Sequence, residues 1–463
     1  MLSYKDHINQ HVEFPTNEFD IRNNQLLFNG VDIMQLIEQY GTPFKLTYLP
    51  KISHNIQKAK RLFTDAIKRK GYKGSYTYSY CTKSSHFEFV LNEALKNDIH
   101  IETSSAFDIH LLERLYQQKK ISKATYILCN GYKRPHYLDK IAETIASGFK
   151  NCIPILDNMS ELDFYEKNIS EEFQLGLRMA SEEEPTFSFY TSRLGIRYND
   201  IIGFYKERLA NHPKIKLKML HFFINTGIKD TAYYWSELNR FLDKYCELKE
   251  ICPELDSIDI GGGFPVKNSL QFDYDYEYMV EQIIEYIQSI CRKKRIPEPN
   301  IYTEFGSYTV AESGATIYSV LDQKLQNDRE LWYMMDGSFI SHLPDTWALS
   351  HKFIMLPINK WNDEYHKVNL GGLTCDSMDY YDSESHLGEV FLPKIKKEEQ
   401  LFFGFFHTGA YQESLGGYGG IQHCLIPAPK HILIDKDVNG SFNSSLFAEE
   451  QTGDSMLKVL GYK

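Results

Sequence analysis

The chain has 463 residues and a formal net charge of −11, with 42% hydrophobic and 14% aromatic residues. This length suits about two or three domains, and the apolar content is sufficient for a large core, which excludes an intrinsically disordered chain. The acidic balance argues against nucleic acid as a partner and favours a neutral or cationic small molecule. The eight cysteines show no CxxC spacing, which predicts reduced thiols in a cytoplasmic protein without a metal site or a disulfide framework. We expect neither a signal peptide nor a membrane span.

Residues 1–48 form a lead-in segment. Apolar and β-branched runs predict strands over 25–28 and 44–48, and helical spacing predicts a helix over 33–40. A longer helical pattern follows over 52–68. The two early strands could join a sheet that is formed farther along the chain.

From residue 75, strand-like runs that end in small or polar residues alternate with amphipathic helical patterns. Eight such strands over about 230 residues have the size of a closed (β/α)₈ barrel. A doubly wound open sheet is the alternative. We assign residues 49–306 to the barrel. The predicted strands are Tyr76–Lys83, His100–Ser105, Tyr126–Asn130, Ile153–Asp157, Leu175–Ala180, Lys218–Asn225, Ser257–Gly263 and Ile301–Phe305.

Beyond residue 306, strand-like runs punctuated by glycine dominate, and long helical patterns are few. This texture predicts a second, all-β domain over residues 307–463. If the early strands belong to it, the barrel is an insertion. The predicted strands are Thr309–Val310, Trp332–Met335, Val368–Leu370, Leu401–Phe406 and His431–Ile434.

Lys83 lies where the first predicted barrel strand gives way to a helical pattern over 87–95. Ser84 or Ser85 can cap that helix. In parallel α/β sheets and barrels this edge carries the chemistry. A lysine there could form a Schiff base with a carbonyl cofactor, or it could be an ordinary solvated lysine.

Two other strand ends suit an anion. Gly261, Gly262 and Gly263 follow an apolar strand, and without side chains their backbone N–H groups can close on a phosphate. A tight turn is the alternative. Thr226 ends another strand and supplies a hydroxyl that also suits a phosphate.

Aromatic and acidic residues complete this edge. Phe223 could lie flat against an aromatic cofactor or belong to the core. Glu304, followed closely by Gly306, could hold a ring nitrogen in its protonated form or cap a helix. In the second domain, Cys375 could donate a proton and Asp376 could bind a cationic substrate.

Taken together and in order along nearly the whole chain, these stretches resemble the fold-III pyridoxal-phosphate decarboxylases of basic amino acids. This family includes ornithine, diaminopimelate and biosynthetic arginine decarboxylases. The resemblance implies an alanine-racemase-like (β/α)₈ barrel with a second β-barrel or β-sandwich domain. It also implies pyridoxal 5′-phosphate on Lys83 and Glu304 at the pyridine nitrogen.

The same resemblance implies further roles. Thr226, the three glycines and Tyr411 would hold the phosphate, and Arg178 would lie on the barrel floor. Asp336 would contact the substrate. The family pattern further implies a homodimer or a higher assembly, in which Cys375 and Asp376 complete the partner's site.

Two segments narrow the resemblance to biosynthetic arginine decarboxylases: Cys129–Lys133 (CNGYK) and Gly409–Leu415 (GAYQESL). Three positions depart from the family pattern. Phe223 stands where the family has a stacking histidine, Asn225 stands where it has glycine, and Ser307 stands where it has arginine.

We therefore expect decarboxylation of L-arginine to agmatine and CO₂, as in polyamine biosynthesis, with Cys375 as the group that returns a proton. From Ser307 onward the only arginine is Arg329, which disfavours a substrate side chain that ends in a carboxylate. Ornithine, lysine, carboxynorspermidine and diaminopimelate are the alternative substrates. A racemase and a catalytically inactive binding homologue are rival functions. The acidic residues near the expected site are Asp336, Asp345, Asp376, Asp379 and Glu413.

Overall fold

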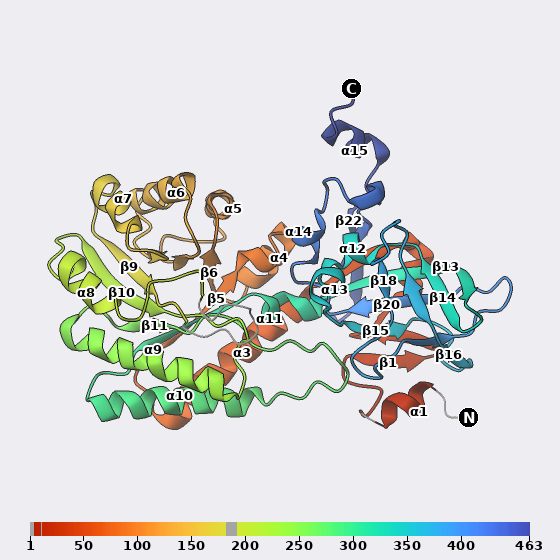
Figure 1. The fold of residues 1–463 in the computed structure, drawn as a ribbon, viewed down its shortest axis with the longest axis horizontal. Coiled ribbons are helices and arrows are strands. Elements are labelled where there is room, and N and C mark those ends of the chain that lie inside the picture. Colours follow the sequence, from red (N-terminus) through yellow and green to blue (C-terminus); the bar gives the residue numbers. More distant parts are fainter. Residues whose placement is uncertain (1–3, 11, 182–191) are drawn as a thin grey trace. The chain divides into compact units, whose positions relative to one another are not determined.

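The computed structural model describes residues 4–10, 12–181 and 192–463, and the chain divides into two compact units. The first, here called the β unit, comprises residues 1–52, 266–273 and 310–463. The second, the barrel unit, comprises residues 53–265 and 274–309. Figure 1 labels the elements of both units. None of the described helices is long and apolar enough to cross a membrane.

Within the described part of the barrel unit, eight parallel strands close into a barrel (Figure 1). Closure occurs where the last strand pairs with the first, with Ile301 opposite Tyr76. This closure confirms the predicted barrel over the open sheet. The strands are β5 (Tyr76–Cys81), β6 (His100–Thr103), β7 (Ile127–Cys129), β8 (Cys152–Leu156), β9 (Phe173–Arg178), β10 (Ile215–His221), β11 (Ser257–Asp259) and β12 (Asn300–Phe305).

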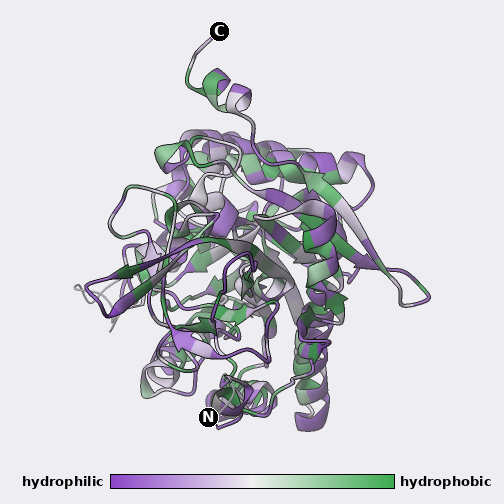
Figure 2. Cartoon of the chain, turned by 90° about the vertical axis from the view of Figure 1, so that its right-hand side faces the viewer, coloured by the Kyte–Doolittle hydropathy of each residue, from purple (hydrophilic) through white to green (hydrophobic). Residues whose placement is uncertain are grey.

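Amphipathic helices connect these strands, and in Figure 2 helices carry both hydrophobic and hydrophilic bands. The helix α10 buries Met279, Ile283 and Ile287 at helical spacing, so one apolar stripe faces inward. Thr231 caps α9 by accepting a hydrogen bond from the Tyr234 amide. The helices are α3 (Leu49–Lys70), α4 (Glu88–Leu95), α5 (Ala106–Gln117), α6 (Pro135–Ala146), α7 (Glu161–Asn168), α8 (Ile201–Phe204), α9 (Ala232–Ile251), α10 (Tyr276–Lys294) and α11 (Ser307–Val310).

Two local predictions are wrong. The cap of α4 is Phe87, without a side-chain hydrogen bond, because a 3₁₀ turn occupies Thr82–Ser84 and the Ser84 hydroxyl donates to the Cys81 carbonyl instead. The predicted strand over Thr309–Val310 belongs to the short helix α11. There the Thr309 hydroxyl donates to the Phe305 carbonyl one turn earlier, so this β-branched residue is accommodated in a helix.

In the β unit, a mixed sheet runs in the order β18-β17-β14-β13-β4-β21-β22, and β15 and β20 pair beside β13. The lead-in strand β4 pairs with both β13 and β21. The strands are β4 (Phe44–Tyr48), β13 (Gly314–Gln326), β14 (Glu330–Met335), β15 (Ile354–Pro357), β17 (Asn369–Gly371), β18 (Tyr380–Tyr381), β20 (Phe402–Phe406), β21 (Lys430–Lys436) and β22 (Phe442–Ala448).

Smaller elements complete the β unit. A separate antiparallel sheet of three described strands follows the N-terminal helix, and a two-stranded ladder pairs β16 with β19. These strands are β1 (Phe19–Arg22), β2 (Gln25–Phe28), β3 (Val31–Asp32), β16 (Tyr365–Lys367) and β19 (Phe391–Pro393). The helices are α1 (Tyr4–Asn9), α2 (Ile33–Tyr40), α12 (Phe339–His342), α13 (Pro344–Leu349), α14 (Gln412–Gly416) and α15 (Gly453–Val459).

Residues 266–273 belong to the β unit, although the sequence placed them in the barrel. Leu270 is buried in the β-unit core. His407 Nδ1 donates to the Lys267 carbonyl at 2.6 Å, and its Nε2 lies 2.9 Å from Glu18 Oε1. These contacts hold an eight-residue segment that is too short to show a periodic pattern of its own.

Candidate active site

Lys83 lies in the 3₁₀ turn directly after β5, beside a carboxylate from the next strand. The ladder pairs Cys81 of β5 with Glu102 of β6, so the Lys83 and Glu102 side chains share one edge. Lys83 Nζ lies 3.3 and 3.2 Å from the two Glu102 oxygens. The Lys83 side chain is 44% exposed and that of Glu102 is fully buried, so the amine is accessible while its acceptor is not. Burial raises the pKa of Glu102 more than the Lys83 charge lowers it.

Glu304, at the end of β12, is held by a set of buried polar groups. Asn130 Nδ2 donates to both Glu304 oxygens at 3.0 and 3.2 Å, and His221 Nε2 lies 3.2 Å from Oε2. Burial alone would raise the pKa of Glu304. The adjacent His221 ring and the charges of Lys83 and Arg178 outweigh burial and lower it to about 2. Glu304 is therefore an anion at neutral pH.

Asp259 lies beside Glu304, and its pKa is shifted in the opposite direction. Its Oδ1 accepts a hydrogen bond from Gly261 N at 2.8 Å, while Oδ2 is buried without a partner among the described residues. Burial, and then the charge of Glu304, raise the pKa of Asp259 well above its usual value. The side chains of His221, Asp259 and Glu304 lie within 4.8 Å of one another, measured between their ligand atoms. Glu304 therefore loses its proton at a lower pH than Asp259 does.

The segment Cys129–Lys133 builds this arrangement from the end of β7. Asn130 points to Glu304, as described above. Lys133 is buried, where it pairs with Glu161 at 3.0 Å and donates to the Ile155 carbonyl at 2.6 Å. Lys133 thereby anchors the loop that carries Asn130.

The loops after β10 and β11 form a cradle that fits a phosphate. A Cβ atom on Gly263 would lie 2.7 Å from Gly227 Cα, and one on Gly227 would lie 2.6 Å from Gly263 O. Side chains there would separate the two loops, whose backbones are joined by a 2.9 Å hydrogen bond from Ile228 N to Gly263 O. The buried Thr226 hydroxyl makes no hydrogen bond with any described residue. An orphaned hydroxyl beside bare backbone is the donor set that a phosphate requires.

The remaining barrel residues lie at the same edge. Arg178 ends β9, and its guanidinium lies 6.0 Å from the centroid of the half-buried Phe223 ring. A Cβ atom on Gly306 would lie 3.1 Å from the Cβ atoms of Cys81 and Ser84. Glycine there lets the end of β12 approach the Lys83 turn.

Four predicted residues belong to the β unit. Asp336, which follows β14, accepts hydrogen bonds from Thr42 Oγ1 at 2.5 Å and from Ser319 Oγ at 2.7 Å. Tyr411 precedes α14 in a left-handed backbone conformation, with φ of +66°. Cys375 and Asp376 lie in the loop between β17 and β18, where Cys375 is exposed.

Four residues around Lys83 and Glu304 were not predicted as site residues from the sequence: Glu102, Asn130, His221 and Asp259. Each is one of the last two residues of a strand or directly follows a strand, so its position near the edge was visible in the sequence. The signal for mutual contact was missing, because these side chains meet through the pairing of strands that lie far apart in the chain.

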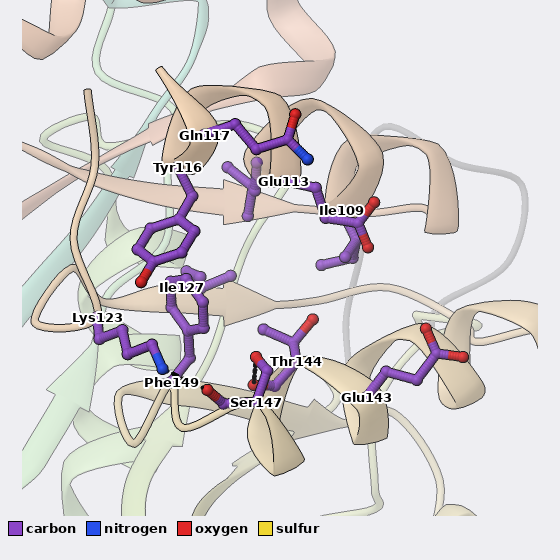
Figure 3. A pocket seen from close by; sticks show the side chains of 11 residues that line it. Ile109, Glu113, Tyr116, Gln117, Lys123, Ile127, Glu143, Thr144, Ser147 and Phe149 are labelled. Atoms are coloured by element: carbon purple, nitrogen blue, oxygen red, sulfur yellow. Dashed lines mark hydrogen bonds between the residues drawn. The ribbon is translucent and has the colours of Figure 1, made fainter. Parts of the chain in front are cut away.

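A separate cavity of about 390 Å³ lies between α5 and α6. In Figure 3, Tyr116 and Gln117 of α5 face this cavity opposite Thr144. Lys123 at its rim donates to the Ser147 carbonyl at 2.6 Å. The cavity belongs to the helix layer and is lined by other residues than those around Lys83.

The fold and the cluster around Lys83 define a barrel enzyme that binds an aromatic, phosphorylated cofactor. Residues 54–311, more than half of the chain, match the family described as pyridoxal-dependent decarboxylase, pyridoxal binding domain. The chain belongs to this family. It is a decarboxylase that depends on pyridoxal phosphate.

Curated relatives and solved structures resemble this chain over most of its length. The biosynthetic arginine decarboxylase of Geotalea uraniireducens is 23% identical over 93% of this chain and 88% of its own length. The biosynthetic arginine decarboxylase of Prochlorococcus marinus is 20% identical over 93% of this chain and 85% of its own length. The structure of the Campylobacter jejuni biosynthetic arginine decarboxylase has a TM-score of 0.82 at 20% identity, covering 100% of this chain and 91% of that one. Diaminopimelate decarboxylase from M. jannaschii has a TM-score of 0.78 at 17% identity, covering 95% and 97%. These likenesses show a shared fold.

Proposed function

We propose that this chain decarboxylates L-arginine to agmatine and CO₂. The observation that supports arginine as the substrate is the scarcity of arginine residues in the β unit. Its segment 310–463 contains one arginine, Arg329, which lies exposed in the turn between β13 and β14. A side chain that ends in a carboxylate, as in diaminopimelate, would find no other guanidinium there. The relatives named above, which are biosynthetic arginine decarboxylases, support the same substrate.

The contacts single out Asp376 among the acidic residues of the β unit. Glu413 pairs with Lys45 at 3.0 Å, and Asp345 accepts a hydrogen bond from Gln412. Asp379 holds its own loop, where it accepts from Thr374 Oγ1 at 2.6 Å. These three carboxylates therefore serve the β unit itself.

Asp376 remains as the substrate contact with open acceptor sites, because Asp336 also accepts hydrogen bonds within the β unit, from Thr42 and Ser319. Asp336 is held by hydroxyl groups, and burial raises its pKa. Asp376 Oδ1 accepts one backbone hydrogen bond, from Met378 N at 2.8 Å. A carboxylate has several acceptor sites, so Asp376 retains capacity for a guanidinium.

In the barrel unit, residues bind and orient the cofactor. Bound pyridoxal phosphate supplies the electron sink that accepts the electron pair left by the departing α-carboxylate. Lys83 would be the covalent attachment point, and Glu102, 3.2 Å from its Nζ, would accept the proton that the amine gives up. The Glu304 anion would hold the ring nitrogen in its protonated form. The Thr226 hydroxyl would donate a hydrogen bond to the phosphate.

Proton return is the role that we assign to the β unit. Cys375 Sγ donates a proton to the α-carbon of the decarboxylated substrate, and Asp376 pairs with the substrate guanidinium. We propose that the protein is a homodimer and that both residues act at the partner's cofactor. The exposure of Cys375 in the single chain supports this arrangement.

The test compares CO₂ release from L-arginine, L-ornithine, L-lysine and diaminopimelate at equal concentration, with agmatine identified by mass. L-arginine is expected to react fastest. Asp376→Ala should lower kcat/KM for arginine, because the guanidinium loses its partner. The fall should correspond to a loss of about 2–5 kcal/mol in transition-state stabilisation. Asp376→Glu should cost less, and Asp382→Ala, an exposed acid in the same region, is the matched control. Faster release from another amino acid would refute arginine, and racemised arginine without CO₂ would refute decarboxylation by this chain.

A further inference from the structure

An exposed cluster of two thiols and an imidazole lies in the β unit. Cys375 Sγ lies 3.4 Å from Cys424 Sγ and 4.0 Å from His423 Nε2. All three ligand atoms fall within 4.8 Å of one another. The sequence predicted no metal site, because Cys375 lies almost fifty residues from the His423-Cys424 pair and no CxxC spacing joins them.

The two distances from Cys375 Sγ are close to those within a zinc coordination shell. Zinc bonds of about 2.3 Å to sulfur and about 2.0–2.1 Å to nitrogen, arranged tetrahedrally, place two sulfurs about 3.8 Å apart and a sulfur and a nitrogen about 3.6 Å apart. The observed distances of 3.4 and 4.0 Å differ from these edges by a few tenths of an ångström. Thiolate and imidazole are also the donors that select zinc over magnesium or calcium.

The backbone fixes Cys375 from one side of the cluster. Asp379 accepts hydrogen bonds from Thr374 N at 3.1 Å and from Phe339 N at 2.7 Å, which tie the Cys375 loop to α12. Leu373 N donates to the Gly337 carbonyl at 2.9 Å. The thiol of Cys375 is thus presented by a constrained turn.

The opposite side carries local backbone strain. Cys424 adopts φ of +54° inside the turn His423–Leu425, a conformation that is uncommon for a residue with a Cβ atom. Hydrogen bonds from Leu425 N to Gln422 O and from Ile426 N to His423 O hold this turn. A strained turn that brings two adjacent donor side chains to a third is characteristic of a functional site.

We infer that Cys375, His423 and Cys424 bind one Zn²⁺ ion, with water from the exposed side as the fourth ligand. Both thiols release their protons when the metal binds, because the thiolate is the ligand. If Cys375 is the proton donor, which rests on the proposed function, bound zinc removes that proton and inhibits the enzyme. Zinc would then act as a reversible inhibitor through residues outside the barrel.

Metal binding is tested directly on the holoenzyme, kept reduced and freed of metal with a chelator. Co²⁺, which replaces zinc and is coloured, is titrated while the ligand-field bands of tetrahedral cobalt are recorded, and Zn²⁺ is then added to displace it. One Co²⁺ per chain is expected. His423→Asn and Cys424→Ser should each weaken binding by about 10-fold or more, since each removes a ligand. His136→Asn, which changes an exposed histidine of α6, should bind as the wild type does.

The absence of tetrahedral bands, or bands that persist unchanged in both His423→Asn and Cys424→Ser, would overturn the site. The inhibition is measured separately, as CO₂ release with and without Zn²⁺. Wild-type activity should fall at the zinc concentration that fills the site, and the two variants should resist. Binding without inhibition would refute the regulatory role and leave the metal site intact. Failure of arginine as a substrate would not affect the cobalt titration.

Discussion

Asn130 stabilises the Glu304 anion, because its amide donates to both carboxylate oxygens. Asn130→Ala removes these donors, so the pKa of Glu304 should rise from about 2 and the acid limb of the kcat/KM profile should shift to higher pH. A hydrogen bond to a charged group contributes about 1.5–3 kcal/mol, so kcat/KM should fall by about 10-fold to 100-fold. Asn168→Ala, on the exposed end of α7, is the control. An unshifted acid limb would show that Asn130 does not set this charge.

Lys83 is tested by Lys83→Ala, with Lys73→Ala as a control at an exposed lysine. The variant should lose the visible absorption of the covalently bound cofactor and nearly all turnover, because the paired, accessible amine at this edge is the attachment point. Absorption spectra and CO₂ release measure both effects. A variant that keeps the spectrum and the activity would contradict the assignment.

Between elements, Glu18 and His407 form a buried pair in the β unit, and His407 also holds the 266–273 segment through the Lys267 carbonyl. Burial alone would raise the pKa of Glu18 and lower that of His407, but their mutual attraction reverses both shifts, and Lys51 and Lys267 lower the pKa of Glu18 further. Because the pKa of Glu18 is lower in the folded state, Glu18 contributes stability to the fold above about pH 4.3, and this stability is lost as the pH falls below that value. Because the pKa of His407 is higher in the folded state, His407 contributes stability to the fold below about pH 6.5. This stability is lost as the pH rises through the pKa of His407 in the folded protein. The contribution of the pair is therefore largest between these limits.

Glu18→Gln should lower the free energy of unfolding by about 3–5 kcal/mol near pH 5.5, because it leaves a buried cation without its partner. Unfolding midpoints measured from pH 4 to 9 should show a smaller loss at both ends of that range than at its middle. Glu13→Gln, at an exposed position, should leave the midpoints unchanged. Equal destabilisation at every pH would argue against the ion pair.

Periodicity was sufficient to predict the eight barrel strands because each is a short apolar run between amphipathic helices. It failed where local pattern and tertiary contact disagree. Thr309 has strand propensity but sits in α11, where its hydroxyl bonds to the preceding turn. Residues 266–273 have no pattern, and their place depends on the buried contacts of Leu270 and Lys267. The Glu102 and Asn130 contacts likewise depend on strand register, which one sequence does not display.

At the scale of the whole molecule, the homodimer is tested by complementation. Lys83→Ala and Cys375→Ala chains, each inactive alone, are mixed and allowed to exchange subunits. If Cys375 acts in the partner's site, a heterodimer has one intact site, and random association should restore about a quarter of the wild-type activity. Confirmed exchange without activity would place Cys375 in the site of its own chain.

The passage of residues 266–273 through the β unit has a consequence for dissecting the gene. A fragment that encodes 53–309 would carry eight residues whose packing partners it lacks, including Leu270. A fragment that begins at residue 310 would lack β4, the strand that pairs with both β13 and β21. Neither unit can therefore be cloned as one continuous segment of the chain. Exchange of either unit between homologues would require four junctions in the coding sequence, chosen together.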